Sequence, residues 1–145
     1  MAKTEKRKIG DLGENAACVF LMKQGFSVLE RNYLKKCGEI DIVAEKRGIL
    51  HFIEVKSVSY ETTQETGKKK HVFNNGVSYE TGRYRPEENM HPGKIRRLLK
   101  TIEVYLMEND VSYETHWQVD LVTARLNMTT RRAKMDMIEN VAGEW

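Results

Sequence analysis

Two neighbouring apolar segments of this sequence carry acidic residues where a buried strand normally has none. Residues 38–44 read Gly-Glu-Ile-Asp-Ile-Val-Ala, and residues 52–56 read Phe-Ile-Glu-Val-Lys. Apolar, β-branched runs of this length are typical of buried strands. A charge inside such a strand is costly unless it is paired or binds a metal ion. The two segments therefore predict strands whose charged side chains have a specific partner.

The charged residues of these two segments are spaced so that they can meet. Side chains alternate across a strand, so Glu39 and Asp41 are expected on one face of the first strand. Glu54 and Lys56 are expected to share one face of the second strand for the same reason. The intervening residues 46–48, Lys-Arg-Gly, are short enough for an antiparallel hairpin, so the strands are predicted to be neighbours. Asp41 and Glu54 would then converge on one divalent cation, with Lys56 beside it.

The predicted cation is Mg²⁺ or Mn²⁺, because carboxylate, carbonyl and water oxygens suit these ions. Asp41 and Glu54 would supply two carboxylates, and the backbone carbonyl of Val55 a third oxygen. Glu39 is a further candidate ligand. A bound metal ion polarises a phosphoryl oxygen and lowers the pKa of a bound water. Lys56 would hold that water or stabilise the charge of the transition state.

Each of these residues also has an ordinary structural interpretation. Glu54 would pair with Lys56, and Asp41 with Lys46 or Arg47, as simple ion pairs. For any one residue taken alone, such a pair is the commoner outcome. The combination favours a metal site, because the predicted hairpin places Asp41 and Glu54 near each other without further adjustment.

The predicted first helix supplies another acid. Residues 6–24 carry apolar side chains at helical spacing, and Thr4 precedes them as a candidate N-cap. Glu14 lies beside Gly10 and Gly13, which would allow the helix to approach the strands closely. Glu14 is therefore a candidate site residue, and a solvated acid on the helix surface is the alternative interpretation.

The order of the predicted elements indicates one domain over residues 1–145, either α/β or α+β, with a sheet flanked by helices. The helices are predicted at 6–24, ending before Gly25, and at 94–109; the strands are predicted at 26–33, 39–45, 49–57 and 117–125, with a short edge strand at 135–141. A long polar connection spans residues 57–93. Within it, Asn-Gly at 75–76 predicts a hairpin over residues 71–79.

Composition bounds the location and the partners of the chain. The 145 residues, 40% hydrophobic and 31% charged, fit a globular domain, and no apolar run is long enough to cross a bilayer. The basic N-terminal stretch lacks the apolar centre of a secretory signal. Two cysteines, Cys18 and Cys37, form no disulfide framework. A cytoplasmic location without a membrane partner is expected, and the net charge of +3 permits an anionic partner without requiring one.

Basic residues gather in the long connection and at the start of the second predicted helix. A cluster of this kind is usually a solvated surface, but here it flanks the candidate site, so contact with nucleic-acid phosphates is the second interpretation. The candidate nucleic-acid-binding residues are Lys68, Lys69, Lys70, Arg83, Lys94 and Arg97.

Asp120 interrupts the last long apolar strand in the same manner as Asp41. An ion pair with Arg125 or Lys94 is expected for it, rather than a catalytic role. His51 is expected to be a half-buried strand residue.

Several motifs resemble the YraN-like family of uncharacterised bacterial proteins. They are residues 10–17 (Gly-Asp-Leu-Gly-Glu-Asn-Ala-Ala), 31–33 (Arg-Asn-Tyr), 38–44 and 52–56. Asp41 followed by Glu54-Val55-Lys56 also resembles the PD-(D/E)xK nuclease signature, and the family is grouped with nucleases of that superfamily. The superfamily's nominal proline is replaced here by Ile40, and the connection at 57–93 is longer than expected for the family.

The resemblance implies a restriction-endonuclease-like core: a mixed sheet of four to five strands flanked by helices, in the order α-β-β-β-α-β(-β). It implies a Mg²⁺-dependent nuclease site, and Lys94 matches a lysine that the family tends to carry. The implied site residues are Glu14, Asp41, Glu54 and Lys56.

Three functional hypotheses follow. The leading one is a metal-dependent endonuclease acting on DNA, with branched recombination or repair intermediates among its expected substrates. The alternative is a nucleic-acid-binding module that keeps the nuclease fold without turnover, and the third is a scaffold whose charged strand residues are merely paired. Resolution of a DNA junction would need two sites acting together, so a homodimer is an expected assembly.

Overall fold

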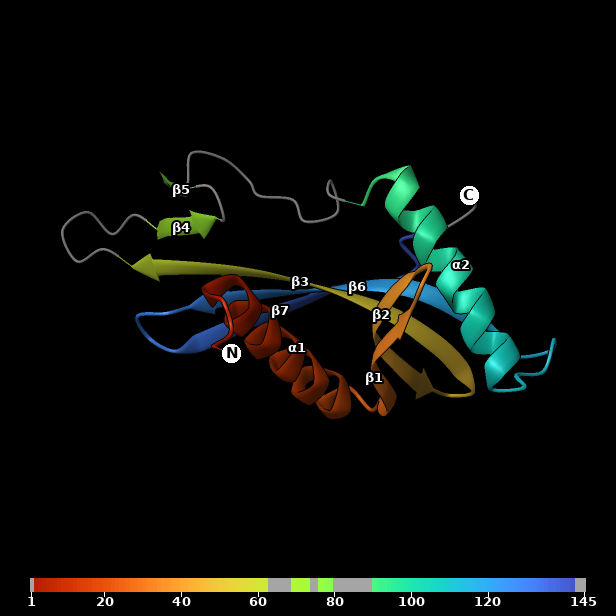
Figure 1. The fold of residues 1–145 in the computed structure, drawn as a ribbon. Helices are drawn as coiled ribbons and strands as arrows, with labels where there is room; N and C mark the ends of the chain where they lie inside the picture. Colours follow the sequence, from red (N-terminus) through yellow and green to blue (C-terminus); the bar gives the residue numbers. More distant parts are fainter. Residues whose placement is uncertain (1, 63–68, 74–75, 80–89, 143–145) are drawn as a thin grey trace.

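The protein is a mixed sheet with one helix on each face (Figure 1). The computed structural model describes residues 2–62, 69–73, 76–79 and 90–142. Its elements in chain order are α1 (Glu5–Lys23), β1 (Ser27–Lys35), β2 (Gly38–Lys46), β3 (Ile49–Thr62), β4 (Lys69–Phe73), β5 (Gly76–Tyr79), α2 (Pro92–Glu108), β6 (Trp117–Asn127) and β7 (Arg132–Ile138). This α+β order confirms the predicted one, and no helix within the described ranges is long and apolar enough to cross a membrane.

The long strand β3 organises the sheet. It pairs in parallel with β6 along most of its length, and β7 follows β6 in antiparallel orientation. On its other side β3 pairs first with β2, up to Ile53, and then with β4, from Ser59 onward. Among the described strands, residues 54–58 of β3 therefore have a partner on the β6 side only. The sheet is open at this point, between β2 and β4.

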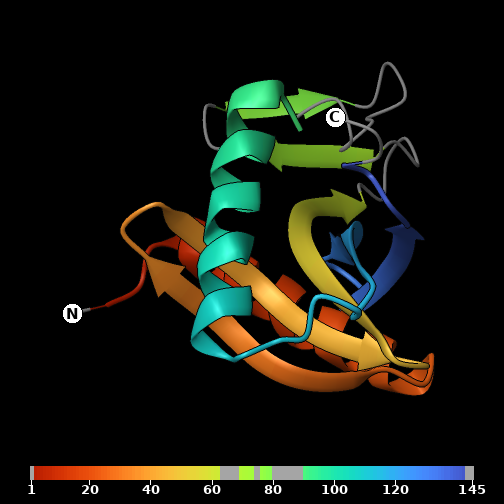
Figure 2. The same cartoon turned by 90° about the vertical axis from the view of Figure 1, so that its right-hand side faces the viewer.

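The two helices cover opposite faces of the sheet and bury two separate apolar cores (Figure 2). In the core under α2, Leu98 and Ile102 pack with Ile40 and other strand residues. In the core under α1, Leu21 packs with Ile42. Burial of such side chains is the main favourable term in folding. Both helices reach the open part of the sheet, because α1 approaches Ser57 closely at Gly13 and Lys94 of α2 pairs with Glu54.

The local signals that begin and end α1 operate as predicted. The Thr4 side chain accepts a hydrogen bond from the backbone N–H of Arg7 at 3.3 Å, which caps the first turn. Gly25 follows the helix with a φ of +91°, a conformation that glycine adopts without steric cost. The helix predicted at residues 6–24 therefore differs from α1, Glu5–Lys23, by one residue at each end.

Gly13 and Gly10 differ, although both were expected to allow close packing. A Cβ on Gly13 would lie 1.7 Å from the Ser57 side-chain oxygen of β3, so α1 touches the sheet there. A Cβ on Gly10 would meet no atom within 4 Å, so that part of the prediction is wrong. The close contact at Gly13 holds the neighbouring Glu14 over the open part of the sheet.

Three strand predictions are confirmed with shifted ends. The hairpin expected at 71–79 is present as β4 and β5, and its turn at 74–75 lies outside the described residues. β3 continues to Thr62, five residues beyond the predicted end, because its last residues pair with β4. The edge strand predicted at 135–141 is β7, Arg132–Ile138, where pairing with β6 sets the limits.

Candidate functional site

The candidate site lies where β2 and β3 separate. Ile42 and Ile53 form the last paired residues of the two strands on this side. Beyond them, the backbones of β2 and β3 no longer pair. Instead, the Asp41 carboxylate links the strands, because its Oδ2 accepts a hydrogen bond from the backbone N–H of Val55 at 2.8 Å. A side chain therefore bridges the two strands at the point where their backbones part.

Asp41 does not follow the simple alternation of faces that the sequence suggested. Ile40 packs in the core under α2, whereas Ile42 packs in the core under α1. Two residues that are two positions apart on a regular strand would share a face, so the alternation is interrupted at Asp41. This explains how its carboxylate reaches the backbone edge of β3 rather than either core.

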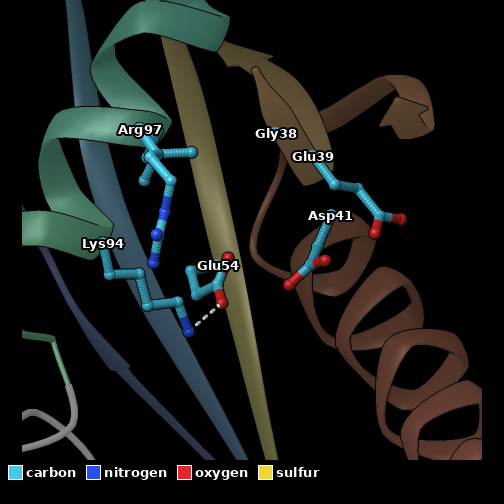
Figure 3. Close-up of a pocket in the computed structure, with 7 residues that line it drawn as sticks. Gly38, Glu39, Asp41, Glu54, Lys94 and Arg97 are labelled. Carbon is cyan, nitrogen blue, oxygen red and sulfur yellow. Dashed lines mark ion pairs between the residues drawn. The ribbon is translucent and has the colours of Figure 1, made fainter. Parts of the chain in front are cut away.

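A cavity of about 250 Å³ opens beside the separated strands. Its lining includes Glu39 and Asp41 from β2, Glu54 from β3, and Lys94 and Arg97 from α2 (Figure 3). The side chain of Glu39 points away from Glu54. Gly38 and Leu98 complete its lining. The cavity thus gathers three acids from the β2–β3 hairpin and two bases from α2, which is distant from the hairpin in the sequence.

Burial and mutual repulsion disfavour the charge on Asp41. Burial is the larger cause and the nearby Glu54 carboxylate the second, and together they raise the pKa of Asp41 to about 8 despite the stabilising hydrogen bond from Val55. Two carboxylates held together at low exposure favour a shared proton or a bound cation. A positive charge near Asp41 and Glu54 would therefore stabilise their ionised forms.

Two lysines, Lys94 and Lys56, supply part of this positive charge. Lys94 Nζ forms an ion pair with Glu54 Oε1 at 2.7 Å. Burial opposes the charge on Lys94, but this pair outweighs it and raises the pKa of Lys94. Burial lowers the pKa of Lys56, and the adjacent charge of Lys94 lowers it further. Lys56 is consequently the weaker base of the two and holds its proton less tightly.

Glu14 and Glu39 form a second group of acids, linked by Asn32. With its amide nitrogen turned toward the two carboxylates, Asn32 donates to Glu39 Oε1 and to Glu14 Oε2, both at 3.1 Å. Arg31 lies 3.8 Å from Glu14 Oε2. Burial, the largest cause, together with Glu39 and Asp11, raises the pKa of Glu14 against the effect of Arg31. Glu14 thus lines a cavity with Asn32 and Glu39, and its charge interacts with that of Asp41.

Asn32 was not among the predicted site residues. Its φ is +53°, in the left-handed region, which asparagine tolerates better than most residues. Sparsely populated backbone conformations of this kind concentrate at functional sites. The signal available in the sequence was its place in the Arg-Asn-Tyr motif. A further cavity of about 360 Å³ contains Asn32, Glu14 and Glu39, and also two bases from α1 that were not predicted, Lys6 and Arg7.

The donor set fits Mg²⁺ or Mn²⁺ held with water and phosphate, rather than an ion enclosed by protein ligands. Across the described ranges, no three His, Cys, Asp or Glu side chains are close enough to bind a metal ion by themselves. Mg²⁺ is commonly bound by one or two carboxylates, with waters and substrate phosphates completing the octahedron. Asp41 and Glu54 would hold the ion, and Glu39 and the Val55 carbonyl stay candidate ligands.

Several predicted nucleic-acid contacts cannot be placed against this site. Lys68 and Arg83 lie outside the described residues, and Lys69 and Lys70 are described only as backbone of β4. Lys94 and Arg97 line the cavity with the acids.

Asp120 and His51 serve the fold rather than the site. Asp120 is fully buried and pairs with His51, not with the predicted Arg125 or Lys94. It also accepts hydrogen bonds from the Gln118 side chain at 2.8 Å and the Asn140 backbone at 2.9 Å. His51 is 4% exposed, so it is buried rather than half-buried. The partner was missed because β3 and β6 pair only through the tertiary fold.

Fold and site together define a small α+β protein with carboxylates and lysines gathered where two strands separate. The sequence matches the uncharacterised protein family UPF0102 over residues 13–139, and the chain belongs to this family. That result confirms the YraN-like family predicted from the motifs.

Relatives share most of the chain. A UPF0102 protein of Campylobacter jejuni is 40% identical over 113 residues, covering 78% of this chain and 80% of its own. One of Campylobacter fetus is 36% identical over 133 residues, with 92% of each chain covered. One of Helicobacter pylori is 32% identical over 135 residues, covering 93% of this chain and 91% of its own.

Proposed function

We propose that this protein is a metal-dependent endonuclease that cleaves phosphodiester bonds of DNA, including branched recombination or repair intermediates. The observation that carries the proposal is that Asp41 and Glu54, from two strands that separate, line one cavity and interact electrostatically, with Lys56 two residues beyond Glu54 on β3. Asp41, whose pKa is raised, lines the cavity, and Lys56, whose pKa is lowered, is close enough to interact with its charge although it is not among the lining residues. Perturbed pKa values of this kind concentrate at functional sites.

The fold supports membership of the PD-(D/E)xK superfamily. The order of helices and strands, the antiparallel β2–β3 pair and the parallel β3–β6 pair agree with the restriction-endonuclease-like core that the motifs imply. The signature residues Asp41 and Glu54-Val55-Lys56 lie together at the open part of the sheet. Fold alone does not define an activity, so the proposal rests on the site.

Asp41, Glu54 and Lys56 would have different roles in phosphodiester hydrolysis. A divalent ion bound here would polarise a phosphoryl oxygen and lower the pKa of a bound water. Asp41, which accepts a hydrogen bond from the Val55 N–H, and Glu54 line one cavity and would supply two carboxylates to such an ion. Lys56 would donate hydrogen bonds to the attacking water or to a phosphoryl oxygen.

Bases on both sides of the acids favour an extended anionic substrate. Lys94 and Arg97 of α2 lie on one side, and Lys6 and Arg7 of α1 line the cavity on the other. Glu39 lines both cavities, so the two groups flank the same acids. Lysine and arginine contacts to phosphates position a nucleic-acid strand without reading its sequence.

Cleavage of DNA in vitro tests the proposal directly. Purified protein is incubated with supercoiled, single-stranded and four-way-junction DNA, with Mg²⁺ or Mn²⁺ and, separately, with EDTA. We expect metal-dependent cleavage that Asp41→Asn and Lys56→Ala each reduce at least about a hundredfold. Asp110→Asn and Lys23→Ala change exposed residues away from the cavity and serve as matched controls. Cleavage that is unchanged by Asp41→Asn, or absent on every substrate, would refute the proposed endonuclease activity.

A nucleic-acid-binding module without turnover is the second candidate. It is favoured by the ion pair between Lys94 and Glu54, which occupies a carboxylate oxygen that a metal ion would need. Salt-sensitive DNA binding that survives Asp41→Asn, without cleavage under any metal condition, would support this module over the enzyme.

A further inference from the structure

Strand β7 forms an edge of the sheet that carries an ordered pattern of side chains. Within the described ranges it pairs with β6 only. Met135 and Met137 pack partly buried against the core under α1, and Ala133 lines a cavity on the same face. Lys134 and Asp136 alternate with them and are exposed. The edge thus presents apolar residues on the α1 face and one base and one acid on the other.

The α1 face beside this edge is apolar and exposed. Leu12 is 49%, Val19 48% and Met128 42% exposed. A cavity of about 460 Å³ runs between α1 and the β6–β7 turn, and Leu12, Ala16 and Ala133 are among its lining residues. Exposed apolar surface that continues along a free strand edge is typical of a protein-binding surface.

A second copy of the same chain fits this edge best in one register. When two β7 strands pair antiparallel about a twofold axis, directly opposed residues must share a face, so the axis passes through a residue. An axis at Met135 sets Lys134 of each copy opposite Asp136 of the other. An axis at Lys134 would pair Arg132 with Asp136 but oppose two lysines at its centre, and an axis at Asp136 would oppose two aspartates.

The register at Met135 also matches the apolar face. It places the two Met135 side chains opposite each other and Met137 of the second copy opposite Ala133. Ala133 lines the cavity beside Leu12, so the methionine of the second copy would cover part of the exposed apolar surface. Charge pairing on one face and apolar contact on the other select the same alignment.

We propose that the protein forms a homodimer by antiparallel pairing of β7 strands, centred on Met135, which joins the two sheets into one. A lysine on an edge strand discourages pairing with unrelated strands. Here Lys134 lies opposite an aspartate, Asp136 of the second copy, when the axis passes through Met135. The proposal does not depend on the activity of the site, because no residue of the acidic cavity takes part.

Charge reversal tests the register, with the oligomeric state measured by sedimentation velocity over a range of concentrations. The wild type is expected to form a dimer. Lys134→Asp turns both ionic pairs into acid–acid contacts, and Asp136→Lys turns both into lysine–lysine contacts. Each change should raise the dissociation constant at least about tenfold. Carrying both changes in one chain restores both ionic pairs, so this variant should dimerise as the wild type does.

Mixing the two single variants gives the sharper result. Lys134→Asp chains present acids at both positions and Asp136→Lys chains present lysines at both, so an equimolar mixture should form a heterodimer while each variant alone stays monomeric. This outcome also shows that both variants are folded. A wild type that is monomeric at every concentration overturns the proposal. A dimer that withstands Lys134→Asp, or a mixture that stays monomeric, overturns it as well.

Discussion

Lys94 Nζ lies 2.7 Å from Glu54 Oε1, and this contact joins α2 to the strand that carries the candidate metal ligands. The two residues are 30% and 12% exposed, so the pair is only partly solvated. The ammonium group neutralises one member of a carboxylate pair that otherwise repels. A divalent cation between Asp41 and Glu54 would compete with Lys94 for the same oxygen.

Lys94→Met should therefore strengthen the binding of Mn²⁺ and weaken that of DNA. A hydrogen bond to a charged group contributes about 1.5 kcal/mol, so roughly a tenfold tighter metal affinity is expected. Isothermal titration of the protein with Mn²⁺ measures the metal affinity. Lys100→Met, an exposed change on the same helix, is the control. Weaker Mn²⁺ binding by Lys94→Met would show that the lysine assists the ion rather than competing with it.

The raised pKa of Asp41 predicts how stability depends on pH without metal. Its carboxyl titrates at about 8 in the folded chain, against an ordinary value of 3.8. The folded state consequently binds the extra proton between these values. The resulting stabilisation is fully present below pH 3.8 and is lost as the pH rises through about 8.

Asp41→Asn removes this titration and keeps an oxygen that can accept from the Val55 N–H. In EDTA, the thermal midpoint of the variant should exceed that of the wild type at pH 8.5, and the difference should shrink toward about pH 4. Adding Mn²⁺ should raise the midpoint of the wild type more than that of the variant. Asp110→Asn should show no such pH-dependent difference. Equal midpoints for Asp41→Asn and the wild type at both pH values would contradict this prediction.

Gly13→Ala should destabilise the fold, because its Cβ would lie 1.7 Å from the Ser57 side-chain oxygen. Overpacking of this kind costs about 1–3 kcal/mol. Gly10→Ala is a matched control in the same helix, where open space and the higher helix propensity of alanine predict a gain of up to about 1 kcal/mol. Urea unfolding of both variants measures the difference. Equal stabilities would mean that α1 can shift away from β3.

Asn32 combines a backbone role with a side-chain role, and two substitutions separate them. Asn32→Gly keeps the left-handed conformation at φ +53° and removes the amide between Glu14 and Glu39. Asn32→Ala also adds a strained backbone, which costs a further 1–2 kcal/mol or so. We expect both variants to lose DNA cleavage to a similar degree, while alanine unfolds at lower urea than glycine. Full cleavage by Asn32→Gly would show that the Asn32 amide does not contribute to activity.

Much of the local structure was readable from the sequence because it depends on neighbouring residues. Helical spacing in residues 6–24, the Thr4 cap and the Gly25 stop define α1. The apolar runs at 38–44 and 52–56 predicted β2 and β3, and the short turn between them predicted their pairing. The prediction that Asp41 and Glu54 approach each other needed only this hairpin, and both line one cavity.

The contacts that give the site its electrostatic character were decided by the tertiary structure. Lys94 is forty positions from Glu54 in the sequence and reaches it only because α2 packs over β2 and β3. Three other features likewise depend on elements brought together by folding. They are the change of strand face at Asp41, the Asn32 amide between Glu14 and Glu39, and the Asp120–His51 pair. By itself the sequence determined the elements and the acids they carry, since periodicity and turn chemistry act over a few residues. The partners of those acids depend on the packing of distant segments, which no local pattern encodes.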